Sequence, residues 1–380
     1  MVWEKSGEEG IIGPAEKVRR AQHKKNVLLA LAENFQGFLA GEVKKETGIE
    51  PHLIAIHDVN FVAKAGRSAR VNLVNVNFRS EQGIHKASLA VKFFKEREIN
   101  TNEGQEKVLK EFERALGLYR RLEGYEKVRT PKPLYNNPAE RVIVYEGIRG
   151  HSYLEVPMDR NKKAQLAGHA LAIIHGSTIR AIDIERLQKL SAITVIKLPI
   201  SKSKKEELLE LIKPQISLLE NSSGGAMAFG DFHANNVMFS TGVSEKEKKI
   251  EEITWVIDPE YFDPEEEHIC RFEDIGIFYA IPTLEEYIKF GTLYEVYKDI
   301  EAFLQGYDSF LLQETCMNLE DLYPEGIPLD FHIALGNITY ALDLFYQKGD
   351  KGRYIIEKCI KTAEEILRKK PFSSLKYRKK

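Results

Sequence analysis

The sequence has few cysteines, no long apolar run and no excess of charge of either sign. Its three cysteines, Cys270, Cys316 and Cys359, lie far apart and form no CxxC pair, so neither a disulfide framework nor a thiolate zinc site is expected. We interpret all three as ordinary buried or half-buried thiols. No apolar run approaches the roughly 20 residues that cross a bilayer, and MVWEKSGEEG at the start lacks the apolar core of a signal peptide. We therefore expect a soluble, cytoplasmic protein without a membrane partner.

The charges balance, because 55 Lys and Arg residues oppose 57 Asp and Glu residues for a net charge of -2. This balance gives no general attraction to nucleic acid, so no nucleic-acid partner is expected and any anion-binding site must be local. A chain of 380 residues with 43% hydrophobic and 10% aromatic residues is typical of a globular protein with two lobes. The oligomeric state stays open.

The periodicity of the sequence predicts an α+β chain. Residues 15–47 have helical spacing, and the segment from about Leu53 to Phe94 alternates apolar and polar residues, as an antiparallel sheet does. A helix from about Asn102 to Leu122 follows, and then RVIVYEGI, a strand that ends in glycines at a hinge. Beyond the hinge the pattern is mainly helical, with helices expected at Lys162–His175, Lys204–Leu219, Leu284–Gln305, Phe331–Gln347 and Tyr354–Arg368.

Two loops carry the side chains suited to chemistry. GDFHANN, Gly230 to Asn236, lies between two apolar runs, and VIDPE follows about 27 positions after Asp231 with Asp258 and Glu260. Phosphoryl transfer needs a group that accepts a hydroxyl proton, a divalent metal on the phosphates and a cation against the charge. Asp231 is the candidate base. Asn236 and Asp258 are candidate Mg2+ ligands, and Glu260 is the next carboxylate on the same side if the segment stays extended.

A simpler interpretation is that these residues form turns. Asp231, Asn235 and Asn236 are types that tolerate left-handed backbone and bond to their own main chain. For one such cluster alone, that interpretation is the better one. Two clusters in this order, each entered from an apolar strand, favour the catalytic interpretation.

The complete pattern resembles a known family. A lysine in a strand, an acidic helix, a strand into a hinge, a GDxHxxN loop and an IDxE segment follow one another from about Val62 to Ala280. This order resembles the aminoglycoside phosphotransferase and choline kinase group. The resemblance implies a two-lobed, protein-kinase-like α+β fold, with an antiparallel sheet in the N-terminal lobe and a mainly helical C-terminal lobe. It also implies ATP and Mg2+ as cofactors and a hydroxyl of a small molecule as phosphate acceptor.

The resemblance assigns roles in both loops. Asp231 matches the family's catalytic base, Asn236 its metal-binding amide and Asp258 its principal magnesium ligand, with Glu260 as a further carboxylate. His233 matches the loop histidine, which we place in the catalytic set although such histidines are more often structural braces.

The resemblance also assigns residues to the nucleotide. Lys92 in LAVKFF matches the strand lysine that contacts phosphates, and Glu111 is the best match for its ion-pair partner. The other glutamates left open for that partner are Glu103, Glu106 and Glu113. Ser68, in the turn AKAGRSA, could face a phosphate, although a bare hairpin turn fits equally well. RVIVYEGI places Tyr145, Glu146 and Ile148 near the adenine.

Some positions depart from the family pattern. Phe229 replaces the histidine that often precedes the GD pair, which removes one brace, and the nucleotide turn is poor in glycine. Asp274 matches a position that usually braces the C-terminal lobe. From these matches we expect a helical extension over residues 1–50, a nucleotide-binding lobe over 51–149 and a helical lobe with the catalytic and metal loops over 150–380. An atypical Ser/Thr protein kinase and a nucleotide-binding pseudokinase scaffold stay open as alternatives.

Overall fold

The computed structural model describes residues 55–65, 69–80, 83–94, 102–139, 141–148, 150–243, 250–263 and 269–373. The described residues fall into two compact units. The first unit takes those up to Leu109 together with 134–148, and the second takes Lys110–Pro133 together with those after 149. The predicted helical extension over residues 1–50 lies outside the described residues.

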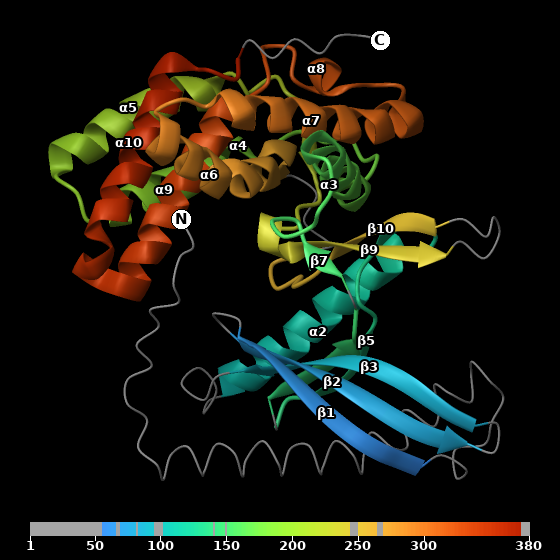
Figure 1. Cartoon of the computed structure of the whole chain (residues 1–380). Helices are drawn as coiled ribbons and strands as arrows, with labels where there is room; N and C mark the ends of the chain where they lie inside the picture. Colours follow the sequence, from blue (N-terminus) through green and yellow to red (C-terminus); the bar gives the residue numbers. More distant parts are fainter. Residues whose placement is uncertain are drawn as a thin grey trace. The chain divides into compact units, whose positions relative to one another are not determined.

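The first unit is built on a five-stranded sheet. Its strands run in the order β1-β2-β3-β6-β5, and β1 to β3 and β6 pair antiparallel. Alternating apolar and polar residues suit a sheet with one buried face, which is the pattern that predicted these strands. Figure 1 shows the three long strands side by side. Their bounds are β1 Ala55–Ala65, β2 Ala69–Ser80, β3 Gly83–Phe94, β5 Pro133–Asn137 and β6 Val142–Glu146.

The second unit is mainly helical, with two small sheets. One sheet has the order β4-β10-β9-β7 and the other pairs β8 with β11. The strands are β4 Val128–Arg129, β7 His151–Ser152, β8 Gly225–Ala226, β9 Val237–Val243, β10 Ile250–Val256 and β11 Ile269–Cys270. The helices are α3 Arg160–His175, α4 Ile184–Lys197, α5 Lys202–Ser217, α6 Arg271–Phe290, α7 Tyr294–Thr315, α8 Leu319–Leu322, α9 Leu329–Lys348 and α10 Arg353–Lys369, with short 3-10 turns at Ala234–Asn236 and Gly349–Gly352. An α+β chain with an N-terminal antiparallel sheet and a mainly helical C-terminal part is therefore confirmed.

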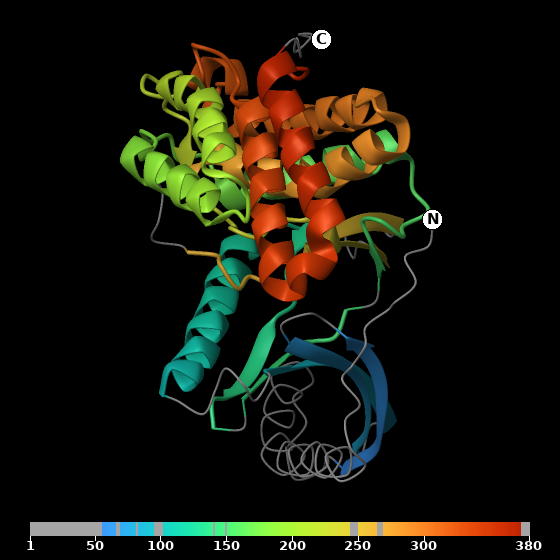
Figure 2. The ribbon, with the colours of Figure 1, turned by 90° about the vertical axis from the view of Figure 1, so that its left-hand side faces the viewer.

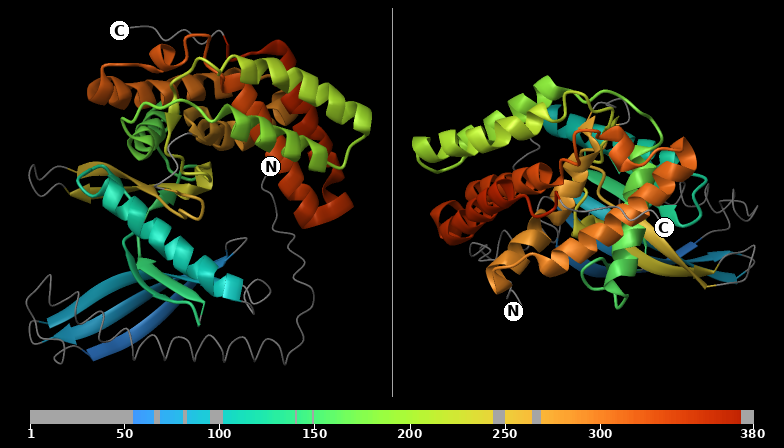
Figure 3. Two further views of the ribbon diagram at one scale, coloured as in Figure 1. Left: turned by 180° about the vertical axis from the view of Figure 1, so that it is seen from behind. Right: turned by 90° about the horizontal axis from the view of Figure 1, so that it is seen from above.

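Local sequence signals explain where several helices start. The carboxylate of Asp159 accepts a hydrogen bond from the Lys162 amide at the start of α3, and Asp183 does the same for Arg186 in α4. Such side-chain caps satisfy first-turn donors that have no partner within the helix. The helix α2, Asn102–Leu122, has the bounds that the sequence predicted. Figure 2 shows α9 and α10 running side by side, and Figure 3 shows α4 beside α5.

The prediction of one helix over Leu284–Gln305 is wrong. Gly291 adopts a left-handed backbone with φ of 67° and ends α6, and α7 starts at Tyr294. The helix α4 was not predicted because its apolar residues face both inward, as Leu187 does, and outward, as Ile196 does. Periodicity gives no signal where both faces are apolar.

The expectation for the cysteines holds for two of the three. Cys270 and Cys359 are buried, but Cys316 is exposed. Cys316 lies just after α7 with a left-handed φ of 58°, where the chain turns away from the helix. Among the helices that the structure describes, none has the length and apolar character needed to cross a membrane.

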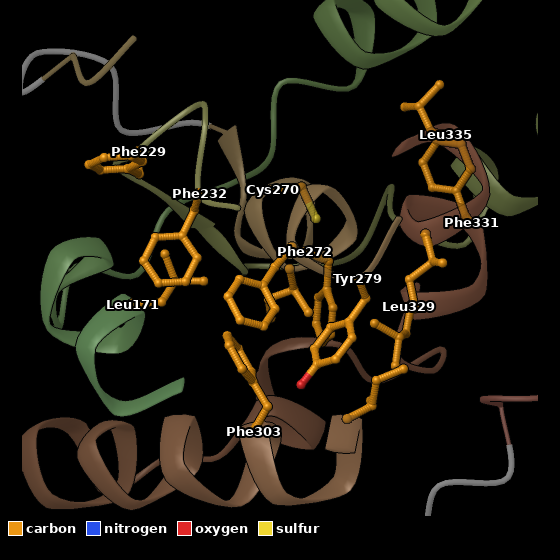
Figure 4. Close-up of a cluster of buried hydrophobic side chains, with 14 of the residues drawn as sticks. Leu171, Phe229, Phe232, Cys270, Phe272, Tyr279, Phe303, Leu329, Phe331 and Leu335 are labelled. Carbon is orange, nitrogen blue, oxygen red and sulfur yellow. The ribbon is translucent and has the colours of Figure 1, made fainter. Parts of the chain in front are cut away.

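Aromatic rings connect the helices of the second unit to the loop after β8. Phe278 of α6 lies 5.1 Å from Phe303 of α7 and 5.5 Å from Phe232, between ring centroids. Phe232 in turn lies 5.8 Å from Phe229, edge to face. Figure 4 shows Phe229 and Phe232 in this buried cluster. Both rings are fully buried, so the loop that holds Asp231 is anchored in the core on both sides.

Two glycines allow α3 and α7 to cross closely. A Cβ atom at Gly168 of α3 would lie 2.0 Å from the carbonyl oxygen of Phe303, and one at Gly306 of α7 would lie 2.0 Å from that of Gln165. Both obstacles are backbone atoms, which cannot move aside as a flexible side chain can. The two helices therefore approach at a distance that only glycine permits.

This crossing predicts the effect of Gly168→Ala. Alanine favours helices over glycine by about 1 kcal/mol, but the clash with the backbone of α7 should reverse that gain and lower the free energy of unfolding by roughly 2 kcal/mol or more. Urea unfolding followed by far-UV circular dichroism measures the change. Gly352→Ala is the matched control because the nearest atom to its Cβ is 3.4 Å away. Equal stability of the two variants would contradict the close crossing.

Candidate active site

The loop between β8 and β9 makes a sharp turn at Gly230. This residue has a left-handed φ of 82°, and a Cβ there would lie 2.7 Å from the Cβ of Tyr261. Glycine is therefore required both by the backbone conformation and by the close approach of the segment after β10, which contains Tyr261. The turn brings the next residue, Asp231, out of the core while Phe229 and Phe232 stay inside it.

The carboxylate of Asp274 in α6 holds this turn. Its Oδ2 accepts a hydrogen bond of 2.7 Å from the Phe229 amide, and its Oδ1 accepts one of 2.8 Å from the Gly230 amide. Asp274 is 1% exposed, so these bonds form away from water. The contacts agree with the bracing position that the resemblance assigned to Asp274. Phe229 stands where the resemblance expected a histidine, and its bond to Asp274 uses only its backbone N–H.

Asp231 and Asn236 are in direct contact. The Nδ2 of Asn236 donates to the backbone oxygen of Asp231 at 3.0 Å and to its Oδ2 at 3.3 Å. His233 lies between them in the turn, with its Nε2 at 3.5 Å from the same Oδ2. The backbone N–H of Asn236 donates to the carbonyl of His233 at 2.8 Å, which closes the turn. The three loop residues that the sequence singled out are thus held together.

Burial, together with the negative charges of Asp258, Glu260 and Asp274, raises the pKa of Asp231 from its ordinary value to about 7. The hydrogen bond from Asn236 acts in the opposite direction. A carboxylate whose pKa lies near neutral pH is suited to accept a proton and release it again. Because the charges of Asp258 and Glu260 act on Asp231, the segment after β10 brings its acidic groups near this residue.

The segment after β10 adjoins the first loop through its backbone. The Ile257 amide donates to the carbonyl of Asn236 at 2.9 Å. Asp258 then adopts a left-handed φ of 61°, which Asp tolerates better than most residues. The sequence placed Glu260 on the same side only for an extended segment, and this condition is not met, because a left-handed residue at Asp258 is followed by a turn at Glu260. The Glu260 carbonyl accepts a hydrogen bond from Arg114 of α2.

The donors in these loops fit a magnesium ion bound together with phosphate. Among the described residues, no group of three or more His, Cys, Asp or Glu is arranged to hold a metal. Magnesium usually takes only one or two protein oxygens, with phosphates and water as its other ligands. The Nδ2 of Asn236 faces Asp231, which leaves Oδ1 as the atom that would meet a cation. Asp258 contributes negative charge that acts on Asp231.

The nucleotide residues expected from the sequence are described within their own units. Lys92 lies in β3 opposite Ile143 of β6, is 4% exposed and has its Nζ 5.4 Å from the ring centre of Phe94. Glu146 ends β6 and is exposed, and Ile148 follows it. Glu111 of α2 belongs to the second unit and is 1% exposed. Ser68 lies outside the described residues. The roles of these residues stay predictions.

The sequence reasoning missed a set of buried residues behind the loop. These residues are His175, Tyr307 and Arg271, for which the sequence analysis gave no role. The structure bonds Tyr307 to both Arg271 and His175, and His175 to Asp274. The available signal was a histidine at the end of the apolar helix segment LAGHALAIIH, since a buried imidazole requires partners.

No protein-family model and no curated protein matches the sequence. Solved structures are similar to it at low identity. An ethanolamine kinase from Plasmodium vivax is 12% identical, with a TM-score of 0.48 over 84% of this chain and 84% of its own. A choline kinase from Streptococcus pneumoniae is 15% identical, with 0.47 over 87% and 99%. A macrolide 2'-phosphotransferase from Brachybacterium faecium is 12% identical, with 0.45 over 84% and 96%.

The names of these three proteins are those of small-molecule kinases and phosphotransferases, the group that the sequence resembles. Because every one of their TM-scores lies below 0.5, we infer the function from the geometry around Asp231.

The raised pKa of Asp231 predicts a pH-dependent effect of Asp231→Asn. The folded state holds the proton of Asp231 up to about pH 7, whereas an unfolded chain releases it near 3.8. The stability that this group contributes is therefore present below the unfolded pKa and lost as the pH rises toward 7. The Asn variant should gain in melting temperature relative to wild type across that range and then level off.

Differential scanning calorimetry without metal measures this difference at a series of pH values. Asn235→Ala serves as control, because Asn235 is exposed and carries no titrating group. A difference between the Asn variant and wild type that does not change with pH would contradict the raised pKa of Asp231.

Proposed function

We propose that this chain is an ATP-dependent phosphotransferase that moves the γ-phosphate to a hydroxyl of a small molecule, with Asp231 as base. The supporting observation is the position of Asp231. It lies in a loop anchored by Asp274, in contact with Asn236, where burial and the charges of nearby acidic groups raise its pKa to about 7. Placing several carboxylates around one partly buried acid is energetically costly, and a turn that only reversed the chain would not require it.

In this proposal Asp231 orients the acceptor hydroxyl and takes its proton as the phosphate is transferred. Asn236 and His233 fix the rotamer of Asp231 from one side of its carboxylate, through contacts of 3.3 Å and 3.5 Å to Oδ2. That leaves Oδ1 as the oxygen for the hydroxyl. Direct in-line transfer requires no covalent intermediate on the protein.

Asn236 and Asp258 would hold Mg2+, with Glu260 as a further carboxylate near them. When bound, the ion neutralises charge on the transferred phosphoryl group. The acidic groups that raise the pKa of Asp231 are the same groups that attract a cation to this site. The roles of Lys92 at the phosphates, of Glu111 as its partner, of Ser68 at a phosphate, and of Glu146 and Ile148 at the base are proposed from the sequence.

The acceptor class is to be found by a screen for ATP consumption with hydroxylated metabolites, amino alcohols and sugars beside peptides. Turnover with small alcohols supports the proposal. Turnover with peptides alone would favour a protein kinase, and nucleotide binding without any turnover would favour a pseudokinase scaffold.

The mechanism predicts a loss of turnover in Asp231→Asn. The amide cannot accept the hydroxyl proton, so kcat should fall on the order of a hundredfold or more. Nucleotide affinity should stay close to that of wild type because the substitution keeps the size of the side chain. ADP release and nucleotide titration measure the two quantities, with Asn235→Ala as control. Unchanged turnover would remove Asp231 from the mechanism.

The metal assignment predicts a different result for Asp258→Ala. Loss of this carboxylate should abolish the part of the nucleotide affinity that depends on magnesium, while binding without metal persists. Isothermal titration calorimetry with ATP, in Mg2+ and in EDTA, separates the two. If wild type and variant bind ATP with equal affinity in Mg2+, Asp258 is not the ligand.

A further inference from the structure

A chain of hydrogen bonds runs through the core to the loop that holds Asp231. It joins Arg271 and Asp274 of α6 through Tyr307 of α7 and His175 of α3 (below, the relay). Each of the four residues is at most 1% exposed. The relay ends at the amides of Phe229 and Gly230, the turn that precedes Asp231.

The donor and acceptor capacities of the end groups set the direction of each hydrogen bond. Arg271 can only donate, and its Nη1 lies 3.0 Å from the hydroxyl oxygen of Tyr307. Tyr307 then has its own proton for Nδ1 of His175, at 2.6 Å. With Nδ1 as acceptor, a neutral His175 carries its proton on Nε2 and donates it to Oδ2 of Asp274 at 3.0 Å. The reverse tautomer would set a ring nitrogen without a proton against a carboxylate oxygen.

Other contacts favour a neutral imidazole. Burial lowers the pKa of His175, and the positive charges of Arg271 and Arg121 act in the same direction, against the carboxylate of Asp274. The relay therefore has a positive group at one end and a negative group at the other, with two neutral rings between them. Arg271 keeps further partners in the carbonyl oxygens of Gly176 and Thr178.

The carboxylate of Asp274 accepts three hydrogen bonds in this arrangement. His175 and the Phe229 amide share Oδ2, and the Gly230 amide takes Oδ1. If the imidazole ring rotated, Asp274 would lose the hydrogen bond from His175 that helps to fix the plane of its carboxylate. Its hydrogen bonds to the Phe229 and Gly230 amides would then change in geometry. Gly230 has no side chain to hold its left-handed backbone, so these hydrogen bonds, together with the buried rings of Phe229 and Phe232, hold Asp231 in place.

We propose that Tyr307 and His175 are positioning residues for Asp231: the Tyr307 hydroxyl fixes the tautomer of His175, and His175 fixes the carboxylate of Asp274 that holds the Phe229–Gly230 turn. The link to catalysis rests on the proposed function, because it takes Asp231 as the base. The link to the loop stands on the hydrogen bonds alone. A displacement of a base by a fraction of an ångström is enough to slow a reaction that depends on alignment.

The kinetic test is Tyr307→Phe, which removes one oxygen and keeps the ring. It should lower kcat on the order of tenfold, with KM for ATP within about twofold of wild type. Turnover is read as ADP release from MgATP, with water as acceptor where no alcohol is turned over. Tyr279→Phe is the matched control, because its hydroxyl donates a buried hydrogen bond of 3.0 Å to the Asp299 carbonyl, outside the relay. Equal kcat in both variants would overturn the kinetic claim.

Substitution of His175 provides a rescue experiment. In His175→Gln the side-chain amide nitrogen can take the place of Nε2 and donate to Asp274, whereas His175→Leu has no donor. Turnover should be retained in larger part by Gln than by Leu. Equal loss in both would show that His175 acts by packing alone and would overturn its positioning role.

Two measurements do not depend on turnover. The 15N shifts of His175 in wild type should show the proton on Nε2, and amide exchange at Phe229 and Gly230 should speed up in Tyr307→Phe but not in Tyr279→Phe. A proton on Nδ1, or unchanged exchange, overturns the relay whatever the activity. If both measurements support the relay while wild type consumes no ATP with any acceptor, the proposed function fails and the control of the loop by Tyr307 stands.

Discussion

The geometry of the active loop depends on one buried carboxylate that accepts two neighbouring backbone amides. Asp274 is fixed in the first turn of α6, and both of its oxygens are used to hold the Phe229–Gly230 turn. A buried carboxylate is costly unless its lone pairs are satisfied. Because the lone pairs of buried Asp274 must all be satisfied, the Phe229 and Gly230 amides and His175 must all point at this one carboxylate. This need makes the geometry of its hydrogen bonds specific.

Aromatic residues of the second unit also hold the loop in place, beside the hydrogen bonds of Asp274. Phe229 and Phe232 insert into the cluster of α6 and α7 on either side of Gly230 and Asp231. The backbone is thus fixed by packing at two points and by hydrogen bonds between them. Because the backbone is held in this way, Asp231 stays partly buried with a raised pKa, and the loop does not rearrange to expose its carboxylate to water.

Much of this arrangement could be predicted from the sequence, and what could not has physical causes. The alternation in β1 to β3 and the charged, helix-forming composition of α2 are local signals, so those elements were predicted. The loop residues Asp231 and Asn236 were found because their types and spacing carry chemistry. The path after Asp258 was not, since a left-handed aspartate gives no sign in the sequence.

The relay escaped prediction for a further reason. Arg271, Tyr307 and His175 come from three helices, and a sequence gives no information on which positions of different helices meet. Hydrogen bonds between residues more than 90 positions apart, such as His175 to Asp274 at a separation of 99, are products of packing. Only the unusual burial of an arginine and a histidine, once seen, shows that these positions are more than filling.

The glycine crossing of α3 and α7 has a consequence for the loop itself. Gly306 directly precedes Tyr307, and α3 ends at His175, so the spacing of these helices sets the gap that the tyrosine hydroxyl must bridge. A bulkier residue at Gly306 would act like a wedge, widening that gap and uncoupling the imidazole from its neighbour. The close crossing of α3 and α7 therefore constrains the alignment of the Asp274 carboxylate as well as the size of the residues between the two helices.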